Sequence, residues 1–207
     1  MTTEPSRSVE IELKFDVDPD TPLPNWSGVP GVASASPAEQ RELDAVYFDD
    51  PDAALGRSGY ALRRRTGGPD AGWHIKGPRG ADGSRVELQW PLDDGDLPAA
   101  AVLERVAGVS TGPFSPLARI RNERAVHYLL SDSGEVVAEF ADDHVSTRDE
   151  RSGIEREWHE WEIELGPAGP ADADARAVFF AAVESAALAA GARAAASDSK
   201  LARALGR

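Results

Sequence analysis

Apolar and charged residues alternate along several short segments of this chain. The segment SVEIELKFDVD, residues 8–18, divides into an apolar set, Val9, Ile11, Leu13 and Phe15, and a charged set, Glu10, Glu12 and Lys14. Because successive side chains of a strand point to opposite faces, this pattern predicts a strand with one apolar and one charged face. Two carboxylates and an ammonium group are then crowded onto the same face.

The pattern and its interruptions predict eight strands and three helices. Beyond residues 8–18, strands are expected at residues 42–48, 60–66, 73–77, 85–92, 117–130, 135–147 and 154–165. Helices are expected at residues 94–108, 171–190 and 197–205, and a short helical turn near residues 49–59. Residues 1–7 are expected to form a disordered tail and residues 19–37 a loop. Short turns favour antiparallel pairing, so we predict an α+β protein, an eight-stranded antiparallel β-barrel with helices packed on the outside.

Charged faces recur on these strands with one sign at a time. Arg63 and Arg65 share a face of their strand, and Glu160, Glu162 and Glu164 share a face of theirs. For any single strand, a charged face turned to water is the simpler interpretation. The repetition favours the alternative that the sheet closes with its charged face inward, which would produce a tunnel lined by both signs.

Grouped charges of each sign point to a ligand. Clustered carboxylates repel one another unless a divalent cation lies among them, and Mg²⁺ prefers carboxylate oxygens together with substrate phosphates. Clustered guanidinium groups suit an anion with several oxygens, such as a phosphate chain. The tetrapeptide EIEL occurs at residues 10–13 and again at 162–165, so the two strands are expected to adjoin and to combine their glutamates in one metal site.

Composition narrows the class of protein. The 207 residues are expected to form a single domain, residues 1–207, and the absence of cysteine excludes disulfides and thiolate chemistry. A formal net charge of −14 argues against binding to nucleic acid. We find neither a signal peptide nor a membrane span, and expect a cytoplasmic protein. Only three of the 22 basic residues are lysines, Lys14, Lys76 and Lys200.

These motifs resemble those of the CYTH domain, the triphosphate tunnel metalloenzymes, over nearly the whole chain. Glu10-x-Glu12-x-Lys14 is similar to the family's ExExK signature, and the resemblance continues through the segments AVYFDDPDAALGRSGYALRRRTGG, DAGWHIKGPR, EWEIEL and SDSKLARAL. It implies an eight-stranded tunnel, dependence on Mg²⁺ or Mn²⁺, and a substrate that carries a triphosphate. All three lysines fall on motif positions.

The resemblance also implies roles for individual residues. Metal ligands would be Glu10, Glu12, Glu162 and Glu164, completed by Glu139, Asp142 or Asp143. Phosphate-binding residues would be Lys14, Arg63, Arg65, Lys76 and Lys200, with Arg85, Arg121 and Arg124 as further candidates. Arg121 and Arg124 have opposite parity, so both can point inward only if a bulge separates them. Catalysis is assigned to Glu10, Glu12, Lys14 and Glu164.

The expected activity is metal-dependent hydrolysis of inorganic triphosphate inside the tunnel. Two alternatives of the same enzyme class are thiamine triphosphatase and class IV adenylate cyclase, which needs a base pocket that the sequence does not reveal. A third is a polyphosphate-binding module without activity. The sequence contains no Walker phosphate loop or HExxH motif, and it leaves the oligomeric state open.

Overall fold

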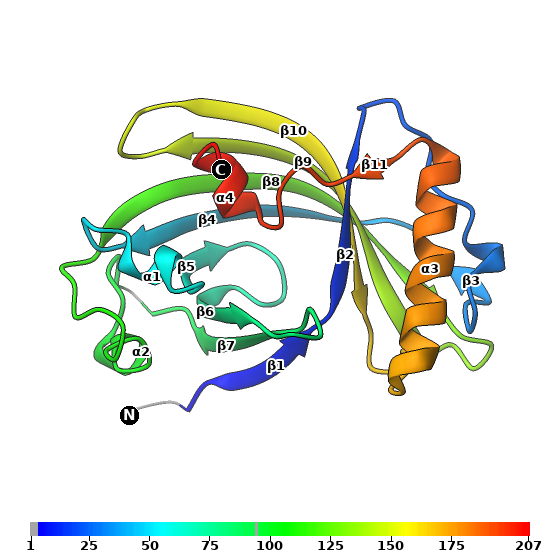
Figure 1. Ribbon diagram of the computed structural model, residues 1–207, viewed down its shortest axis with the longest axis horizontal. Coiled ribbons are helices and arrows are strands. Elements are labelled where there is room, and N and C mark those ends of the chain that lie inside the picture. The colour runs from blue at the N-terminus through cyan, green and yellow to red at the C-terminus, as the bar shows by residue number, and fades with distance from the viewer. Residues whose placement is uncertain (1–3, 94) are drawn as a thin grey trace.

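The computed structural model describes residues 4–93 and 95–207, and within them the chain forms a mostly antiparallel sheet of 11 strands with a few helices (Figure 1). The strands are β1 (Ser6–Glu10), β2 (Glu12–Val17), β3 (Ser34–Ala35), β4 (Glu39–Asp49), β5 (Ala61–Thr66), β6 (Gly72–Arg79), β7 (Arg85–Pro91), β8 (Ser115–Leu130), β9 (Val136–Asp149), β10 (Glu155–Leu165) and β11 (Arg193–Ala194). The helices are the 3₁₀ turn η1 (Trp26–Gly28), α1 (Ala54–Arg57), α2 (Ala100–Leu103), α3 (Ala173–Ala190) and α4 (Lys200–Ala204).

Most predicted elements are confirmed, but the expected loop at residues 19–37 contains η1 and β3, and three further expectations differ. Ser6 and Arg7 belong to β1, so the expected tail of residues 1–7 is wrong for these two; residues 1–3 lie outside the described residues. The helix expected at residues 94–108 shortens to α2 followed by turns, and Asp94 is also outside the described residues. The expected single strand at residues 8–18 is two strands, interrupted at Ile11.

The prediction of a closed eight-stranded barrel is wrong, because hydrogen bonds do not close the sheet. The strand order is β1-β7-β6-β5-β4-β8-β9-β10-β2-β11, with β3 added beside β8. The segment interrupted at Ile11 pairs with β7 through its first half and with β10 through its second half. In Figure 1 the two halves diverge, so a chain segment rather than a ladder joins the two ends of the curved sheet.

Apolar residues on the convex face are covered by helices at two places. At one end, Phe179 and Val183 of α3 pack against Phe140, Trp161 and other residues of a buried cluster. Asp172 caps the N-terminus of α3, where its side chain accepts from the N–H groups of Asp174 and Ala175. A second cluster joins Leu55 of α1 and Val102 of α2 to Trp73, Trp90 and other residues of the strands β4–β7. These clusters confirm the prediction that helices pack on the outside of the sheet for α1, α2 and α3, but the prediction is wrong for α4.

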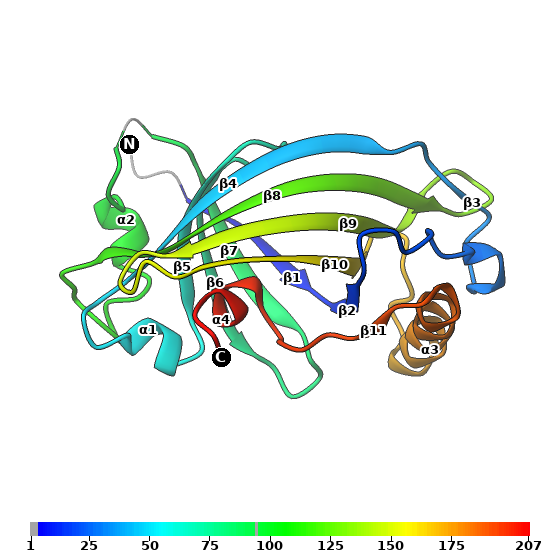
Figure 2. The same cartoon turned by 90° about the horizontal axis from the view of Figure 1, so that it is seen from above.

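Helix α4 differs from the others because it lies on the concave side (Figure 2). Ala204 of α4 is buried with Ala118, Ile120, Val145 and Trp158, whose side chains point to that side. The concave face is therefore apolar where α4 covers it and charged beyond that contact. No helix within the described residues combines the length and the apolar character needed to cross a bilayer.

Candidate metal and phosphate site

The charged part of the concave face borders a cavity of about 700 Å³. Its walls come from β1, β2, β4–β10 and the start of α4, so the whole curved sheet contributes to it. The charged residues that line it are Glu10, Glu12, Lys14, Arg41, Arg63, Arg65, Asp70, Lys76, Arg79, Arg85, Glu87, Arg124, Glu139, Glu162, Glu164, Asp198, Lys200 and Arg207. The inward orientation expected for the charged faces is thus observed.

One wall carries a row of carboxylates. The register of the sheet places Glu164 of β10 directly opposite Glu12 of β2 on one side and Glu139 of β9 on the other. Directly opposed like charges destabilise a sheet unless something neutralises them. Burial, with Glu12 and Glu162 adding repulsion, raises the pKa of Glu164 to about 7. Removal from water contributes most to this shift, and the nearby Lys76 offsets only part of it.

Glu10 is the last residue of β1, next to the break before β2, and its pKa is also raised. Its Oε2 accepts from Nζ of Lys76 at 2.6 Å. Burial, a hydrogen bond with Glu87 and the charge of Glu87 nevertheless raise the pKa of Glu10 to about 8. When no further cation is present, Glu10 is therefore largely protonated near neutral pH and Glu164 about half protonated.

A second acidic group lies deeper, on β9 and β10. Single oxygens of Asp143, Glu160 and Glu162 all lie within 4.8 Å of one another. Nζ of Lys200, the first residue of α4, lies 2.8, 2.5 and 2.7 Å from them respectively. Lys14 also forms an ion pair with Glu162. The ammonium groups here occupy the space beside the carboxylates that a divalent cation would also favour.

Arg124 ties this group to β8. Its Nε and one terminal nitrogen donate to the two oxygens of Asp143, each at 2.7 Å, and the same terminal nitrogen donates to Glu162 at 2.5 Å. Asp143 is fully buried, and the charges of Arg124 and Lys200 hold its pKa below the ordinary value despite burial. Paired donors on both oxygens make this the most rigidly held carboxylate of the site.

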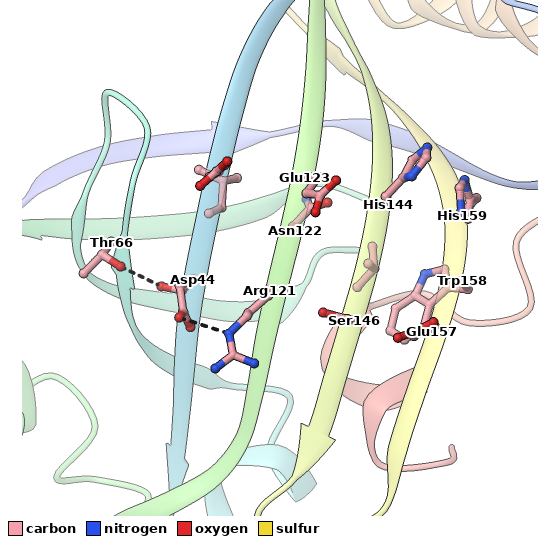
Figure 3. A pocket seen from close by; sticks show the side chains of 13 residues that line it. Asp44, Thr66, Arg121, Asn122, Glu123, His144, Ser146, Glu157, Trp158 and His159 are labelled. Atoms are coloured by element: carbon pink, nitrogen blue, oxygen red, sulfur yellow. Dashed lines mark hydrogen bonds and ion pairs between the residues drawn. The ribbon is translucent and has the colours of Figure 1, made fainter. Parts of the chain in front are cut away.

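The predicted inward placement of Arg121 is wrong. Between Arg121 and Arg124 the register of β8 against β9 is continuous, so no bulge brings both side chains to one face. Arg121 lies on the convex face, 62% exposed, with its Nε 3.4 Å from Oδ2 of Asp44 (Figure 3). Asp142, one of three candidates for the last metal ligand, also lies on that face and accepts from Nε1 of Trp161 at 3.1 Å. Of that trio only Glu139 lines the cavity.

The opposite wall, on β5–β7, is cationic. Arg65 is buried and Arg63 half-buried at the cavity, and within the described residues neither Nε–H has a hydrogen-bond partner. Burial, together with the positive charges of Arg63 and Arg124, lowers the pKa of Arg65 to about 9. Guanidinium groups so close together are stabilised by an anion with several oxygens. Arg85 differs, because its side chain donates to the carbonyl oxygens of Gly77 and Gly59.

Two residues that the sequence analysis did not assign hold this wall in place. Glu87 of β7 accepts from Arg63 at 3.1 Å and lies 2.8 Å from Nδ1 of His74. The other ring nitrogen of His74 lies 2.9 Å from the carbonyl oxygen of Asp70. Strand alternation could have identified Glu87, because it shares a face with Arg85 and both residues line the cavity. Glu160, which the sequence analysis placed on the acidic face without a role, belongs to the deeper acidic group.

The side chains present fit a hard divalent cation. One cluster of carboxylate oxygens lines the cavity, and a second reaches the cavity through Glu162. Oxygen ligands are those that Mg²⁺ and Mn²⁺ prefer. Burial raises the pKa values of Glu10 and Glu164, and the charge of Lys76 offsets only part of each shift. Glu10, Glu12, Glu139 and Glu164 could hold an ion at the cavity surface, and Asp143, Glu160 and Glu162 could hold one deeper, where Lys200 now lies.

Sequence comparison finds one domain family. The CYTH domain profile matches residues 8–184. The chain is also 39% identical over 214 aligned residues to the uncharacterized proteins MT2285 and Rv2226 of two Mycobacterium tuberculosis strains. The match covers 98% of this chain but 41% of each relative, so the chain spans less than half the length of these relatives.

Three solved structures share the fold at low sequence identity. A proposed adenylate cyclase of Bacillus halodurans is 18% identical with a TM-score of 0.62, covering 95% of this chain and 97% of its own. HpAC1 of Hippeastrum, described as a proposed adenylyl cyclase with a dominant triphosphatase activity, is 17% identical with a TM-score of 0.60, covering 96% and 95%. The PH1819 protein of Pyrococcus horikoshii is 17% identical with a TM-score of 0.58, covering 95% and 98%.

Proposed function

The chain belongs to the CYTH domain family, and we propose that it is a divalent-metal-dependent hydrolase of triphosphate-bearing substrates, with inorganic triphosphate as its substrate. One observation carries this proposal. A row of carboxylates and a group of arginines face the same cavity from opposite walls, and the arginines retain unpaired N–H groups within the described residues. A substrate bound between them must be both strongly anionic and able to share a cation with carboxylates.

The arginine and lysine side chains bind and orient the phosphate chain. Arg63 and Arg65 offer planar donors for one phosphate group, and Lys14 and Arg124 lie beside the acidic wall for another. Lys76, between Glu10 and Glu87, bridges the two walls. Fixing an extended anion in this way removes much of the entropic cost of aligning a water molecule with the phosphorus atom.

A bound Mg²⁺ or Mn²⁺ would neutralise phosphoryl oxygens and polarise the bond that breaks. The chain itself supplies the carboxylates that hold such an ion and a group able to take a proton. Glu164 lines the cavity beside the phosphate-binding residues, and a carboxylate at this position that does not ligate the ion can accept the proton of the attacking water. No nucleophilic side chain is required, because preorganised charges stabilise the transition state of phosphoryl transfer.

A second candidate is adenylate cyclase activity, because two structurally similar proteins carry that proposed function. The two activities differ in where they cut: a hydrolase releases a terminal phosphate, whereas a cyclase releases pyrophosphate from ATP. The charged lining of the cavity supports the smaller, more highly charged substrate. Because the chain spans less than half the length of its relatives, the proposal concerns the activity of this domain alone.

The test is a product assay with purified protein and Mg²⁺ or Mn²⁺. Tripolyphosphate, ATP, thiamine triphosphate and long-chain polyphosphate are offered in turn, while phosphate, pyrophosphate and cyclic AMP are measured. We expect metal-dependent release of phosphate from tripolyphosphate, abolished by Glu12→Gln and by Glu164→Gln. Cyclic AMP as the main product would overturn the hydrolase proposal, and tight binding of polyphosphate without turnover would favour a binding module.

A further inference from the structure

A shallow depression lies on the convex face of the sheet, on the other side of the strands from the cavity. Its volume is about 700 Å³, and its side chains come from β4, β5, β8, β9 and β10 (Figure 3). The register places four of these residues in a straight row across neighbouring strands, Glu42, Glu123, His144 and His159. The proposed hydrolase site uses none of them.

The two histidines are in direct contact. His144 of β9 and His159 of β10 are paired across the antiparallel ladder, and their ring centroids are 3.6 Å apart with an angle of 52° between the rings. His144 is exposed and His159 half-buried, and Figure 3 shows both rings on the convex face. Two imidazoles held this close on a rigid sheet can both turn a nitrogen toward one ion at about 2.0–2.1 Å.

Carboxylates flank the pair from two directions. Glu123 of β8 lies directly opposite His144 in the ladder. Asp142 precedes His144 by two residues on the same strand and the same face, diagonal to His159. Nε1 of the buried Trp161 donates to Oδ1 of Asp142 at 3.1 Å and leaves Oδ2 for another ligand. Hydrogen bonds of this kind orient the ligands of metal sites and raise their affinity.

We propose that His144 and His159 bind a transition-metal ion of the Zn²⁺ class on the convex face. Asp142 or Glu123 becomes the third ligand by a side-chain rotation, because the group of three ligand atoms already within 4.8 Å of one another in the described residues is Asp143, Glu160 and Glu162. Imidazole nitrogens together with a carboxylate select such an ion over Mg²⁺, which prefers oxygen ligands. The site is therefore chemically distinct from the acidic cavity behind it. An ion held there joins β9 and β10 on the face opposite Asp143 and Glu160, and so stiffens the strands that carry the deeper acidic group.

The test measures metal binding directly, with the intact chain freed of metal and then titrated with Zn²⁺ in excess Mg²⁺. Isothermal calorimetry gives the stoichiometry and affinity, and the visible absorption of bound Co²⁺ reports nitrogen ligands. The variants are His144→Gln, His159→Gln and Asp142→Asn. His127→Gln is the matched control, because His127 lies on β8 with its Nδ1 2.9 Å from the carbonyl oxygen of Ser36. Glu162→Gln controls for binding in the cavity.

We expect one equivalent of Zn²⁺ in the wild type, in His127→Gln and in Glu162→Gln. The affinity should fall by at least about tenfold in either histidine variant, with loss of the Co²⁺ spectrum, and by about 10- to 100-fold in Asp142→Asn if Trp161 orients that ligand. Added Zn²⁺ should also raise the melting temperature of the wild type and not that of His144→Gln. Wild-type affinity in both histidine variants, or loss of binding only in Glu162→Gln, would overturn the proposal.

Discussion

Nζ of Lys200 lies 2.7 Å from Oε1 of Glu162, although one begins the last helix and the other lies in the middle of β10. The contact places the N-terminus of α4 over the deeper acidic group, which also includes Asp143 and Glu160. In the protein without metal, the negative charge of this group is therefore balanced by Lys200, Lys14 and Arg124.

Replacing Lys200 should destabilise the metal-free protein. Lys200→Met removes the ammonium group that Asp143, Glu160 and Glu162 share, and within the described residues Glu160 has no other ion pair. The free energy of unfolding should therefore fall by about 3 kcal/mol. Urea denaturation measures this, and Mg²⁺ should restore part of the loss by replacing the missing charge. Arg193→Met is the control, because its ion pair with Asp18 is exposed and its loss should cost less than about 1 kcal/mol. Equal, small effects in both variants would contradict the assignment.

The stability of the metal-free protein should depend on pH through Glu10 and Glu164. Their pKa values are raised to about 8 and about 7, so the folded state keeps protons that the unfolded state has already lost. The free energy of unfolding should therefore fall as pH rises from about 4.5 to about 8, by at most about 3 kcal/mol for Glu164. Urea denaturation across this range should show the decline. Glu164→Gln or added Mg²⁺ should flatten the curve; an unchanged slope in both would contradict it.

Arg124 and Arg121 form a matched pair for testing which face binds substrate. Arg124→Ala removes the partner of Asp143 and Glu162 and a cation of the cavity, so kcat/KM for tripolyphosphate should fall by about 100-fold or more. Arg121→Ala changes an exposed side chain on the convex face and should leave kcat/KM within about twofold. Steady-state kinetics decide between these outcomes, and equal losses would show that the faces are wrongly assigned.

Arg63 should act through the geometry of its guanidinium group rather than through its charge alone. Arg63→Lys keeps the charge but loses the paired donors and the unpartnered Nε–H, so tripolyphosphate should bind about tenfold more weakly. Calorimetric titration without metal measures this binding apart from turnover. Arg64→Lys, the neighbour on the opposite face of β5, should bind as the wild type does. Full affinity in Arg63→Lys would mean that charge alone recruits the substrate.

Packing of α3 should contribute to stability without entering the chemistry. Phe179 is 1% exposed among Phe140, Trp161 and Val183, so Phe179→Ala should lower the free energy of unfolding by about 3–5 kcal/mol. Val178→Ala, at a 60% exposed position on the same helix, should have little effect. Chemical denaturation measures both. Unchanged kcat in folded Phe179→Ala would show that α3 only supports the sheet.

Strand alternation predicted much of the site because parity alone fixes which side chains share a face. Glu10, Glu12 and Lys14 were placed together in this way, as were Glu162 and Glu164, and all five line the cavity. Alternation also places Arg121 and Arg124 on opposite faces of β8. The expected bulge between them is absent, because the pairing of β8 with β9 is continuous over these residues. For Arg121, simple alternation along the strand gave the right face, and the assumption of a bulge gave the wrong one.

What local pattern could not provide was the pairing of distant segments. The break at Ile11 arises because the residues on either side pair with different strands, and Ile11 itself shows ordinary alternation. The concave position of α4 depends on contacts with Ile120, Val145 and Trp158, which helical spacing does not reveal. The support of Arg63 by Glu87, and of Glu87 by His74, likewise follows only once β5, β6 and β7 are adjacent.

The divided first strand also sets an order of events during synthesis. Residues 6–17 leave the ribosome before the rest of the sheet, yet β1 pairs with β7, and β2 pairs with β10, whose first residue is Glu155. Until β10 has been made, β2 has no partner strand from β10, and unpaired strand edges can pair with incorrect segments or other chains. The acidic row of Glu12, Glu164 and Glu139 can therefore assemble only after translation has passed β10, so the proposed metal site is among the last features of this sheet to form.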